Sequence, residues 1–262
     1  MADPQHWLIT GASSGIGRLA AERLQQQGHR LTVICRSQQR ADQTLGWLTG
    51  ESRLLLADLA DLDQVQAVGQ ALRQRDDALD GLLLNAGLQY AGHRQVRWSA
   101  QSLELTIAVN HLAHQRLVMD LLPLLLRSLT PRLVITASEV HNPASGGGRV
   151  GRPASLGDLS GLKKHSEMVN GERPFDADKA YKDSKLCNLL MGRHLALLHP
   201  QLPVICWSPG LVIPRGRDGF FRNSREANPL GQALFGFVAR DLLRLTEHPQ
   251  RAAELLERLV LD

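Results

Sequence analysis

Three glycines within seven residues constrain the fold of this chain more than any other feature of its sequence. Residues 7–10, Trp-Leu-Ile-Thr, are typical of a short buried strand, and apolar positions at helical spacing begin at Leu19. Gly11, Gly15 and Gly17 lie between them. Glycines in such a turn let the backbone approach a pyrophosphate, whose charge is attracted by the helix N-terminus. The sequence therefore predicts a dinucleotide-binding loop, and an ordinary strand-to-helix turn is the alternative.

Two arginines follow the next predicted strand, residues 30–35. Arg36 stands at the position where an NAD-binding enzyme places a carboxylate for the ribose hydroxyls. A guanidinium there, with Arg40 one helical turn further on, suits the 2′-phosphate of NADP. We therefore predict NADP(H) as the cofactor. Alternatively, both arginines are solvated surface residues.

A tyrosine and a lysine four residues apart form a candidate acid/base pair. Tyr181 and Lys185 would share one face of a helix. The pKa of a tyrosine in water is about 10, and a neighbouring cation lowers it by favouring the phenolate. Three of the five lysines of the chain lie between 179 and 185. In a chain that otherwise uses arginine, this clustering supports a functional lysine ammonium beside Tyr181. Pairs at this spacing are also common on solvated helix faces, and the lysines could cluster by accident.

Apolar strand-like segments alternate with helical patterns along the whole chain, which is typical of an α/β domain with a parallel sheet. Strands are expected near residues 7–10, 30–35, 53–57, 81–85, 132–137 and 203–208, in the order 3-2-1-4-5-6. Helical stretches are expected over 99–127, 229–246 and 249–261. With 262 residues, 43% of them hydrophobic, and no repeat or linker, the chain is predicted to form one domain.

An ordered set of short motifs runs through nearly the whole chain. The set comprises the glycine loop 11–17, Asp58-Leu59, Asn85-Ala86-Gly87, Asn110, Ser138, Tyr181 with Lys185, and Pro209-Gly210. In this order the motifs resemble those of the short-chain dehydrogenase/reductase family. The resemblance implies a Rossmann-like, doubly wound parallel sheet and an NAD(P)-dependent oxidoreductase.

The resemblance also implies catalytic roles for four residues. Tyr181 would give or take the proton, and Lys185 would lower the pKa of that tyrosine and hold the nicotinamide ribose. Ser138, at the end of an apolar strand, would orient the substrate oxygen. Asn110 would anchor a water relay to the lysine. Each could instead be a turn or cap residue, and only the ordered set favours the catalytic interpretation.

Cofactor contacts are implied for the loops at the strand ends. Asp58, followed by Leu59, would touch the adenine, residues 85–87 would pass beneath the cofactor, and residues 209–210 would border the nicotinamide. The full set of expected cofactor-binding residues is Gly11, Ser13, Ser14, Gly15, Ile16, Gly17, Arg36, Arg40, Asp58, Leu59, Asn85, Ala86, Gly87, Tyr181, Lys185, Pro209 and Gly210.

Within this family the chain resembles the light-dependent protochlorophyllide reductases. The resemblance lies in residues 180–188, in Asn110-His111-Leu112, and in a long insertion at about 139–178. In those enzymes NADPH gives a hydride to a tetrapyrrole double bond, and the tyrosine region supplies the proton. The chain departs from their pattern at 97–99, at Val109 and at 211–214. We therefore expect a relative of that branch whose substrate need not be the pigment.

Three further expectations concern Cys187, the stretch 142–153 and the end of the sheet. Cys187 matches a cysteine assigned to pigment contact, and we interpret it instead as a packed small apolar side chain. The Gly/Pro-rich stretch 142–153 is expected to form a loop over the active site. Members of the branch usually continue to a seventh strand. The two helical stretches at 229–246 and 249–261 are followed by no strand-like pattern here, so we expect the seventh strand to be missing.

Charge and cysteine content argue against several other function classes. A net charge of +4 with 4% aromatic residues disfavours nucleic-acid binding. Three cysteines at no metal-ligand spacing indicate a reducing, cytoplasmic compartment, and His111 and His114 have no acidic or cysteine partners for a metal. The first strand follows Met1 too closely for a signal peptide, and the apolar run 117–126 is too short to cross a bilayer.

Two hypotheses about function remain. The first is an NADPH-dependent oxidoreductase, monomeric or homodimeric, that acts on a bulky hydrophobic carbonyl or conjugated double bond beneath the loops of Gly146 and Phe220-Phe221. The alternative is a non-catalytic NADPH-binding sensor or assembly protein, suggested by the missing strand and the altered segment after Gly210. Both bind NADPH, and only the first oxidises it.

Overall fold

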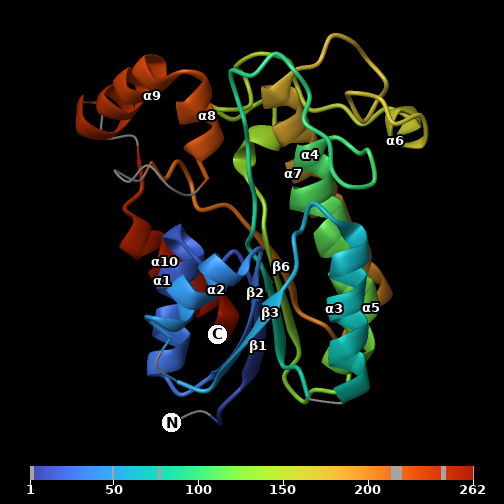
Figure 1. Ribbon diagram of the computed structural model, residues 1–262, viewed down its shortest axis with the longest axis vertical. Helices are drawn as coiled ribbons and strands as arrows, with labels where there is room; N and C mark the ends of the chain where they lie inside the picture. Colours follow the sequence, from blue (N-terminus) through green and yellow to red (C-terminus); the bar gives the residue numbers. More distant parts are fainter. Residues whose placement is uncertain (1–2, 49, 76–77, 214–219, 243–245, 262) are drawn as a thin grey trace.

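A six-stranded parallel sheet forms the centre of the computed structural model (Figure 1). The structure describes residues 3–48, 50–75, 78–213, 220–242 and 246–261. The strands are β1 (His6–Thr10), β2 (Arg30–Cys35), β3 (Ser52–Leu56), β4 (Gly81–Leu84), β5 (Arg132–Thr136) and β6 (Val204–Trp207). Their order is β3-β2-β1-β4-β5-β6. Both the predicted strands and the predicted order are confirmed.

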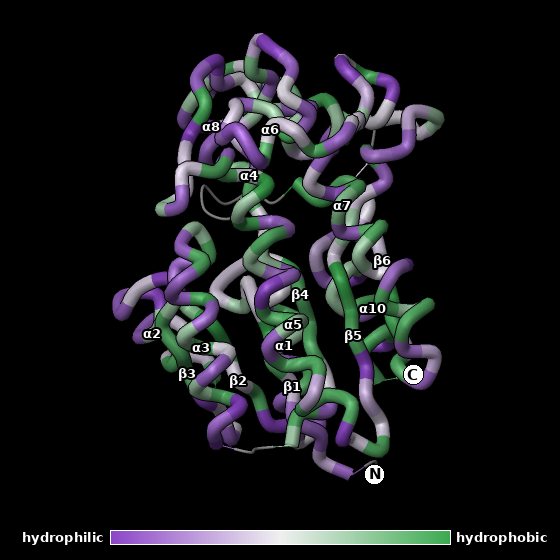
Figure 2. The backbone as a smooth tube through the Cα atoms, turned by 90° about the vertical axis from the view of Figure 1, so that its right-hand side faces the viewer, coloured by the Kyte–Doolittle hydropathy of each residue, from purple (hydrophilic) through white to green (hydrophobic). Residues whose placement is uncertain are grey.

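Helices cover both faces of the sheet, as the alternating pattern predicts. One face carries α1 (Gly15–Gln26), α2 (Gln38–Leu45) and α10 (Pro249–Leu261), and the other carries α3 (Leu62–Arg75), α5 (Ala113–Leu125) and α7 (Ala177–Leu198). In β1, the side chains of Trp7 and Ile9 pack in the apolar cluster that includes α1 and α10, and the side chain of Leu8 packs in the cluster that includes α3 and α5. All three side chains are fully buried. Such strands are apolar on both sides, and β4 and β5 are correspondingly green in Figure 2.

The C-terminal helix α10 has the predicted bounds. It packs against α1, where Ala252 and Leu256 lie in the same apolar cluster as Ala20 and Leu24. Within the described residues the sheet ends at β6, with no further strand. None of the helices in that part of the chain is both long and apolar enough to cross a lipid bilayer.

The predicted helical stretch 229–246 is interrupted. It contains α9 (Pro229–Gly236) and a π-helical turn (Phe237–Leu242), and its residues 243–245 lie outside the described part of the chain. A short helix that the sequence analysis did not predict, α8 (Arg222–Ala227), precedes it.

The prediction of one helix over 99–127 is wrong at its start. Helix α4 (Leu105–Ile107) begins six residues later, continues through a π-helical turn (Ala108–Leu112) and leads into α5. Glu104 caps this start, because its carboxylate accepts hydrogen bonds from the backbone N–H groups of Thr106 and Ile107, both at 2.9 Å. Ser99 is instead held in a turn, where its hydroxyl accepts a bond from the N–H of Leu103 at 3.1 Å.

The segment between β5 and α7 packs above the sheet. It contains a 3-10 turn (Glu139–His141) and α6 (Ser160–Lys163), and the predicted loop 142–153 has neither helix nor strand. A third apolar cluster anchors it, in which Met168 and Phe175 pack with Tyr90 and with Ala180 of α7. This segment is thereby attached to the helix that carries the predicted acid/base pair.

Candidate active site

The predicted site residues meet at one edge of the sheet. The glycine loop follows β1, Arg36 follows β2, Asp58 follows β3, Asn85 follows β4, Ser138 follows β5, and Pro209 and Gly210 follow β6. This edge is formed by the carboxyl ends of all six parallel strands. Open α/β sheets bind their ligands at this edge.

The glycine loop is shaped by close backbone contacts. Gly11 has φ +74°, and a Cβ added there would lie 2.7 Å from Cα of Ala86. A Cβ on Gly17 would lie 2.4 Å from the carbonyl oxygen of Gly11. Gly15 has φ +61° with nothing within 4 Å of an added Cβ, and the Ser14 side chain makes no capping hydrogen bond. The start of α1 is therefore an open cradle that fits the pyrophosphate of a dinucleotide.

Thr10 joins this cradle to the next strand and to α5. Its hydroxyl oxygen accepts hydrogen bonds from the N–H groups of Asn85 and Ala86, both at 3.0 Å, and donates to Nε2 of His114 at 2.9 Å. Nδ1 of His114 donates to the carbonyl oxygen of Asn110 at 3.1 Å. Burial lowers the pKa of His114 to about 3, so the ring is neutral. The sequence analysis missed Thr10; its place at a strand end before the glycines could have indicated it.

Asn85 continues these contacts across the sheet. Its amide nitrogen donates to the carbonyl oxygen of Gly11 at 3.4 Å, and its amide oxygen accepts from the hydroxyl of Thr136 at 3.2 Å. Thr136 in turn accepts a bond from the indole N–H of Trp207 at 3.0 Å. The ends of β1, β4, β5 and β6 are therefore tied together beneath the site.

Three of the four predicted catalytic side chains converge. The Ser138 side chain lies close enough to the Tyr181 hydroxyl to favour its ionised form. Nζ of Lys185 lies 5.6 Å from the centroid of the Tyr181 ring and donates to the carbonyl oxygen of Thr136 at 2.8 Å. Helix α7 supplies the tyrosine and the lysine, and the end of β5 supplies the serine.

The predicted lowering of the Tyr181 pKa is not found. Burial raises the pKa of this phenol above its usual value, and the nearby Ser138 side chain opposes the rise only in part. Burial also lowers the pKa of Lys185 to about 8. The ammonium bonds the Thr136 carbonyl oxygen and lies near the tyrosine ring. A buried cation in that position does not compensate the phenolate for lost hydration.

Replacing Lys185 by methionine is expected to stabilise the cofactor-free protein near neutral pH. The unfolded chain keeps the lysine proton up to about pH 10.5 and the folded chain only to about pH 8, so a buried ammonium opposes folding below pH 8. We expect a gain of about 1–3 kcal/mol at about pH 7, which shrinks between about pH 8 and 10. Urea unfolding at both ends of this range measures it, with Lys163→Met, on an exposed side chain, as the control. A gain that does not change with pH would contradict this assignment.

Asn110 lies in the π-helical turn, a feature common at functional sites. Its side chain accepts from the N–H of Leu88 at 2.8 Å and donates to the Leu88 carbonyl oxygen at 2.9 Å and to the Ser184 hydroxyl at 3.1 Å. A Cβ on Gly87 would lie 3.5 Å from Oδ1 of Asn110 and 3.7 Å from Nζ of Lys185. Asn110 thus holds the loop after β4 beside the lysine, and the water relay stays a prediction.

The residues expected at the adenosine end differ in their surroundings. Arg36 is exposed directly after β2, and Arg40 is half-buried in the first turn of α2, where Nη1 donates to Gln43 at 3.2 Å. Asp58 accepts the N–H of Ala60 at 2.9 Å. Leu59 packs against the core, so its side chain has a structural role.

The loop after β6 lies beside the segment that follows Ser138. Gly210 has φ +72°, and its N–H donates to the hydroxyl of Ser208 at 3.4 Å. The same hydroxyl accepts a bond from the N–H of Glu139 at 3.3 Å. Pro209 is half-buried next to it. These contacts place the Pro-Gly turn at the serine side of the site.

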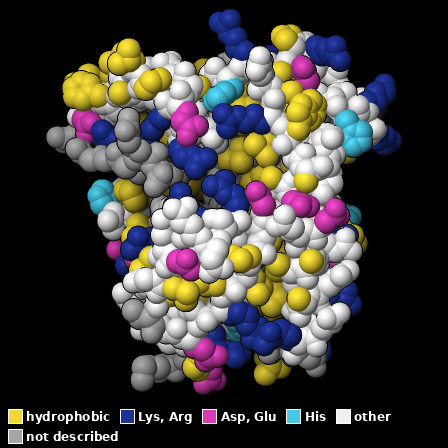
Figure 3. Space-filling view, in the orientation of Figure 1, with side chains coloured by type: hydrophobic (Ala, Val, Ile, Leu, Met, Phe, Trp, Pro, Cys, Tyr) yellow, Lys and Arg dark blue, Asp and Glu magenta, His cyan; other side chains and the backbone are white. Residues whose placement is uncertain are grey.

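Aromatic side chains border Tyr181. The ring of Phe220 packs edge-to-face against it with centroids 5.3 Å apart, and Phe221 packs edge-to-face on Phe220 at 5.1 Å. On the face seen in Figure 3, Lys and Arg side chains border one side of a recess in the upper half of the molecule that contains hydrophobic side chains. Burial raises the pKa of the Cys187 thiol to about 12, which agrees with a packed cysteine rather than a reactive thiolate.

Comparison with known proteins identifies the family. A family model described as short chain dehydrogenase matches residues 5–148. The chain belongs to the short-chain dehydrogenase family. It is therefore an oxidoreductase of a family that uses NAD(P)(H). The described residues of this short-chain dehydrogenase include no group of three or more His, Cys, Asp or Glu side chains that could hold a metal ion.

Individual relatives agree with this assignment. A protochlorophyllide reductase of Avena sativa is 34% identical over 95% of this chain and 84% of its own length. The chloroplastic enzyme of Cucumis sativus is 37% identical over 95% of this chain and 65% of its own length. A short chain dehydrogenase structure from Escherichia coli CFT073, complexed with NADPH, has a TM-score of 0.67 and 26% identity, and the match covers 98% of this chain and 91% of that one.

Proposed function

We propose that this short-chain dehydrogenase uses NADPH to reduce a hydrophobic carbonyl or a conjugated double bond. The observation that carries the proposal is the convergence of the Tyr181 hydroxyl with the Ser138 side chain, with Lys185 beside the tyrosine ring. These side chains lie at the carboxyl edge of the sheet, where the glycine cradle also lies. A proton donor and a cofactor cradle at one edge are what a hydride-transfer enzyme requires.

The residues divide the work as follows. Bound NADPH supplies the hydride. Backbone groups of residues 11–17 hold its pyrophosphate, and Arg36 and Arg40 pair with its 2′-phosphate. Ser138 orients the reacting oxygen, or the corresponding edge of a conjugated substrate, and Tyr181 donates the proton. Lys185, beside the tyrosine ring, holds the nicotinamide ribose.

Two observations support a large apolar substrate. Phe220 packs on the catalytic ring, and its neighbour Phe221 extends the aromatic surface away from it. The relatives of 34–37% identity are named as protochlorophyllide reductases. We therefore propose a substrate as bulky as a tetrapyrrole, or a smaller aromatic or polyene ketone.

A substrate panel tests this function. Oxidation of NADPH is followed with protochlorophyllide, retinal and aromatic ketones, each in darkness and under illumination. Turnover of any of them supports the enzyme, and light dependence would identify the double-bond chemistry. Tight NADPH binding without turnover of any member would instead favour the non-catalytic sensor or assembly protein.

The proposed NADPH preference is tested at the two arginines. Replacing Arg36 and Arg40 together by alanine should weaken NADPH binding by about 10–100-fold and change NADH binding little, because only NADPH carries the phosphate they pair with. Fluorescence titration measures both dissociation constants. Arg73→Ala, on an exposed side chain of α3, is the matched control. Equal losses for the two cofactors would contradict the assignment.

A further inference from the structure

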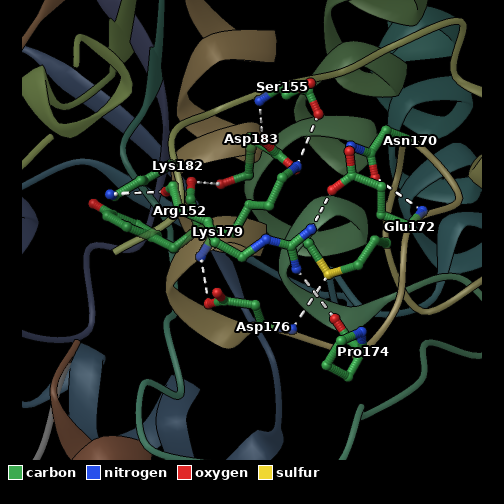
Figure 4. A network of polar contacts seen from close by, with 12 residues as sticks. Arg152, Ser155, Asn170, Glu172, Pro174, Asp176, Lys179, Lys182 and Asp183 are labelled. Atoms are coloured by element: carbon green, nitrogen blue, oxygen red, sulfur yellow. Dashed lines mark hydrogen bonds and ion pairs between the residues drawn. The ribbon is translucent and has the colours of Figure 1, made fainter. Parts of the chain in front are cut away.

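We propose that Lys179, Lys182 and Asp183 are positioning residues, which strap the segment after Ser138 around helix α7 and so hold Tyr181 against Ser138. We call residues 139–155 the strap. The inference rests on the proposed function, because it assigns these buried charges a part in the same reaction. Figure 4 shows the polar contacts that carry it.

Lys182 gathers three carbonyl groups of the strap. Its ammonium donates to the carbonyl oxygens of Gly148 at 3.1 Å, of Arg152 at 3.0 Å, and of Val150. The side chain is only 4% exposed, yet all three N–H donors have acceptors. The acceptors come from alternate residues that curve around one nitrogen. A planar guanidinium, with donors in a fork, would not fit this arrangement.

Lys179 and Asp183 hold the next part of the strap. They form an ion pair at 2.6 Å with side chains 2% and 1% exposed. Both also bind the backbone of Ser155: the ammonium donates to its carbonyl oxygen at 2.9 Å, and the carboxylate accepts its N–H at 2.8 Å. The peptide groups of Ser155 are thereby fixed to the helix from both sides.

These anchors surround the helix. Successive residues of an α-helix are about 100° apart, so Lys179 and Asp183, each two positions from Tyr181, lie on nearly the opposite face. Lys182 lies between the two faces. The strap leaves the end of β5 at Ser138, meets Lys182 on the flank of α7 and reaches Lys179 and Asp183 behind it.

The start of the strap is tied to the serine itself. Nδ1 of His141 donates to the carbonyl oxygen of Ser138, and the hydroxyl of Ser145 donates to the carbonyl oxygen of Glu139 at 2.9 Å. Ser138 and Tyr181 belong to different elements, so their separation depends on how those elements are joined. A strap fixed at both ends sets that separation.

Packing alone does not explain the choice of residues. Burying three charged groups costs free energy, and apolar residues of similar volume usually stabilise a core as well or better. Charges retained at such a cost are consistent with a requirement for one defined geometry. Displacing a catalytic group by about 1 Å can reduce the rate about 100-fold.

The test observes the Tyr181 hydroxyl directly. The chain has two tyrosines, so protein labelled with ¹³C at the tyrosine Cζ gives two NMR signals, which Tyr181→Phe assigns. Ser138→Ala defines the change of chemical shift that accompanies loss of the serine hydroxyl beside Tyr181. We expect Lys182→Met to move the Tyr181 signal in the same direction, and Lys164→Met, an exposed lysine of the same insertion, to leave it in place.

Kinetics give the second readout. Lys182→Met should lower kcat by about 10–100-fold, with KM and the dissociation constant of NADPH within about threefold of wild type. Lys182→Arg should not restore kcat. A purely structural role would lower the fraction of active sites, as counted by NADPH titration, and leave kcat per site unchanged.

Each outcome is decisive. An unmoved Tyr181 signal in folded Lys182→Met protein that binds NADPH overturns the proposal. If that variant does not fold, the double replacement Lys179→Met with Asp183→Asn is used, and failure of both to fold overturns the positioning role in favour of a structural one. If wild-type protein turns over no substrate, the proposed function fails, while the NMR result still decides whether the strap holds Tyr181.

Discussion

Tyr181→Phe is expected to lower turnover of NADPH by about 10³-fold or more while leaving NADPH affinity within about twofold of wild type. The replacement removes only the phenolic oxygen, which lies beside Ser138, and keeps the ring that packs on Phe220. The proton donor is lost and the site keeps its shape. Steady-state kinetics and fluorescence titration of NADPH measure the two quantities.

The other tyrosine of the chain is a matched control. Tyr90 is fully buried, and its hydroxyl donates to the carboxylate of Glu104. Tyr90→Phe should lower the melting temperature, because Glu104 loses a partner, and should keep kcat per folded site near wild type. Equal activity losses in the two variants would show that the phenol at 181 has no special role.

Gly17→Ala is expected to weaken NADPH binding by at least about 100-fold. The new Cβ would lie 2.4 Å from both the carbonyl oxygen of Gly11 and the side-chain nitrogen of Asn85, so the glycine loop and the Asn85 side chain must shift. The cradle for the pyrophosphate then opens, and the helix N-terminus no longer faces the phosphates. Titration calorimetry measures the affinity.

A second glycine separates this local effect from a general intolerance of alanine. Gly46 follows α2, and a Cβ there would approach nothing closer than 3.5 Å. Gly46→Ala should therefore bind NADPH as wild type does. Circular dichroism shows whether Gly17→Ala remains folded, and folded protein with wild-type affinity would exclude the glycine loop as the pyrophosphate site.

Features that depend on local sequence patterns were predictable. The strands could be placed because each is a short apolar run, and the alternation of strands and helices indicated a parallel sheet. The position of Tyr181 and Lys185 on one helix followed from their spacing. Each of these inferences needs only neighbouring residues.

Features that depend on distant partners were not predictable. The start of α4 is fixed by the capping carboxylate of Glu104, which competes with the helical pattern that extends back to Ser99. The direction of the Tyr181 pKa shift depends on burial by segments far away in sequence. From the sequence, Lys179 and Lys182 served only as support for a functional ammonium at Lys185. Their own hydrogen-bond partners lie in the insertion, and the sequence did not indicate them.

The hydrogen bond between Thr10 and His114 joins residues that are 104 positions apart, and Thr10 also binds the backbone of Asn85, 75 positions away. The cradle therefore cannot take its final shape from the first strand, loop and helix alone. Contacts between residues so distant in sequence form late during folding. The chain loses entropy when the long loop between them closes, and only then do the contacts contribute stabilising free energy. Affinity for a dinucleotide is consequently acquired only after the first half of the chain has collapsed around its sheet, so coenzyme capture reports the folding of that half.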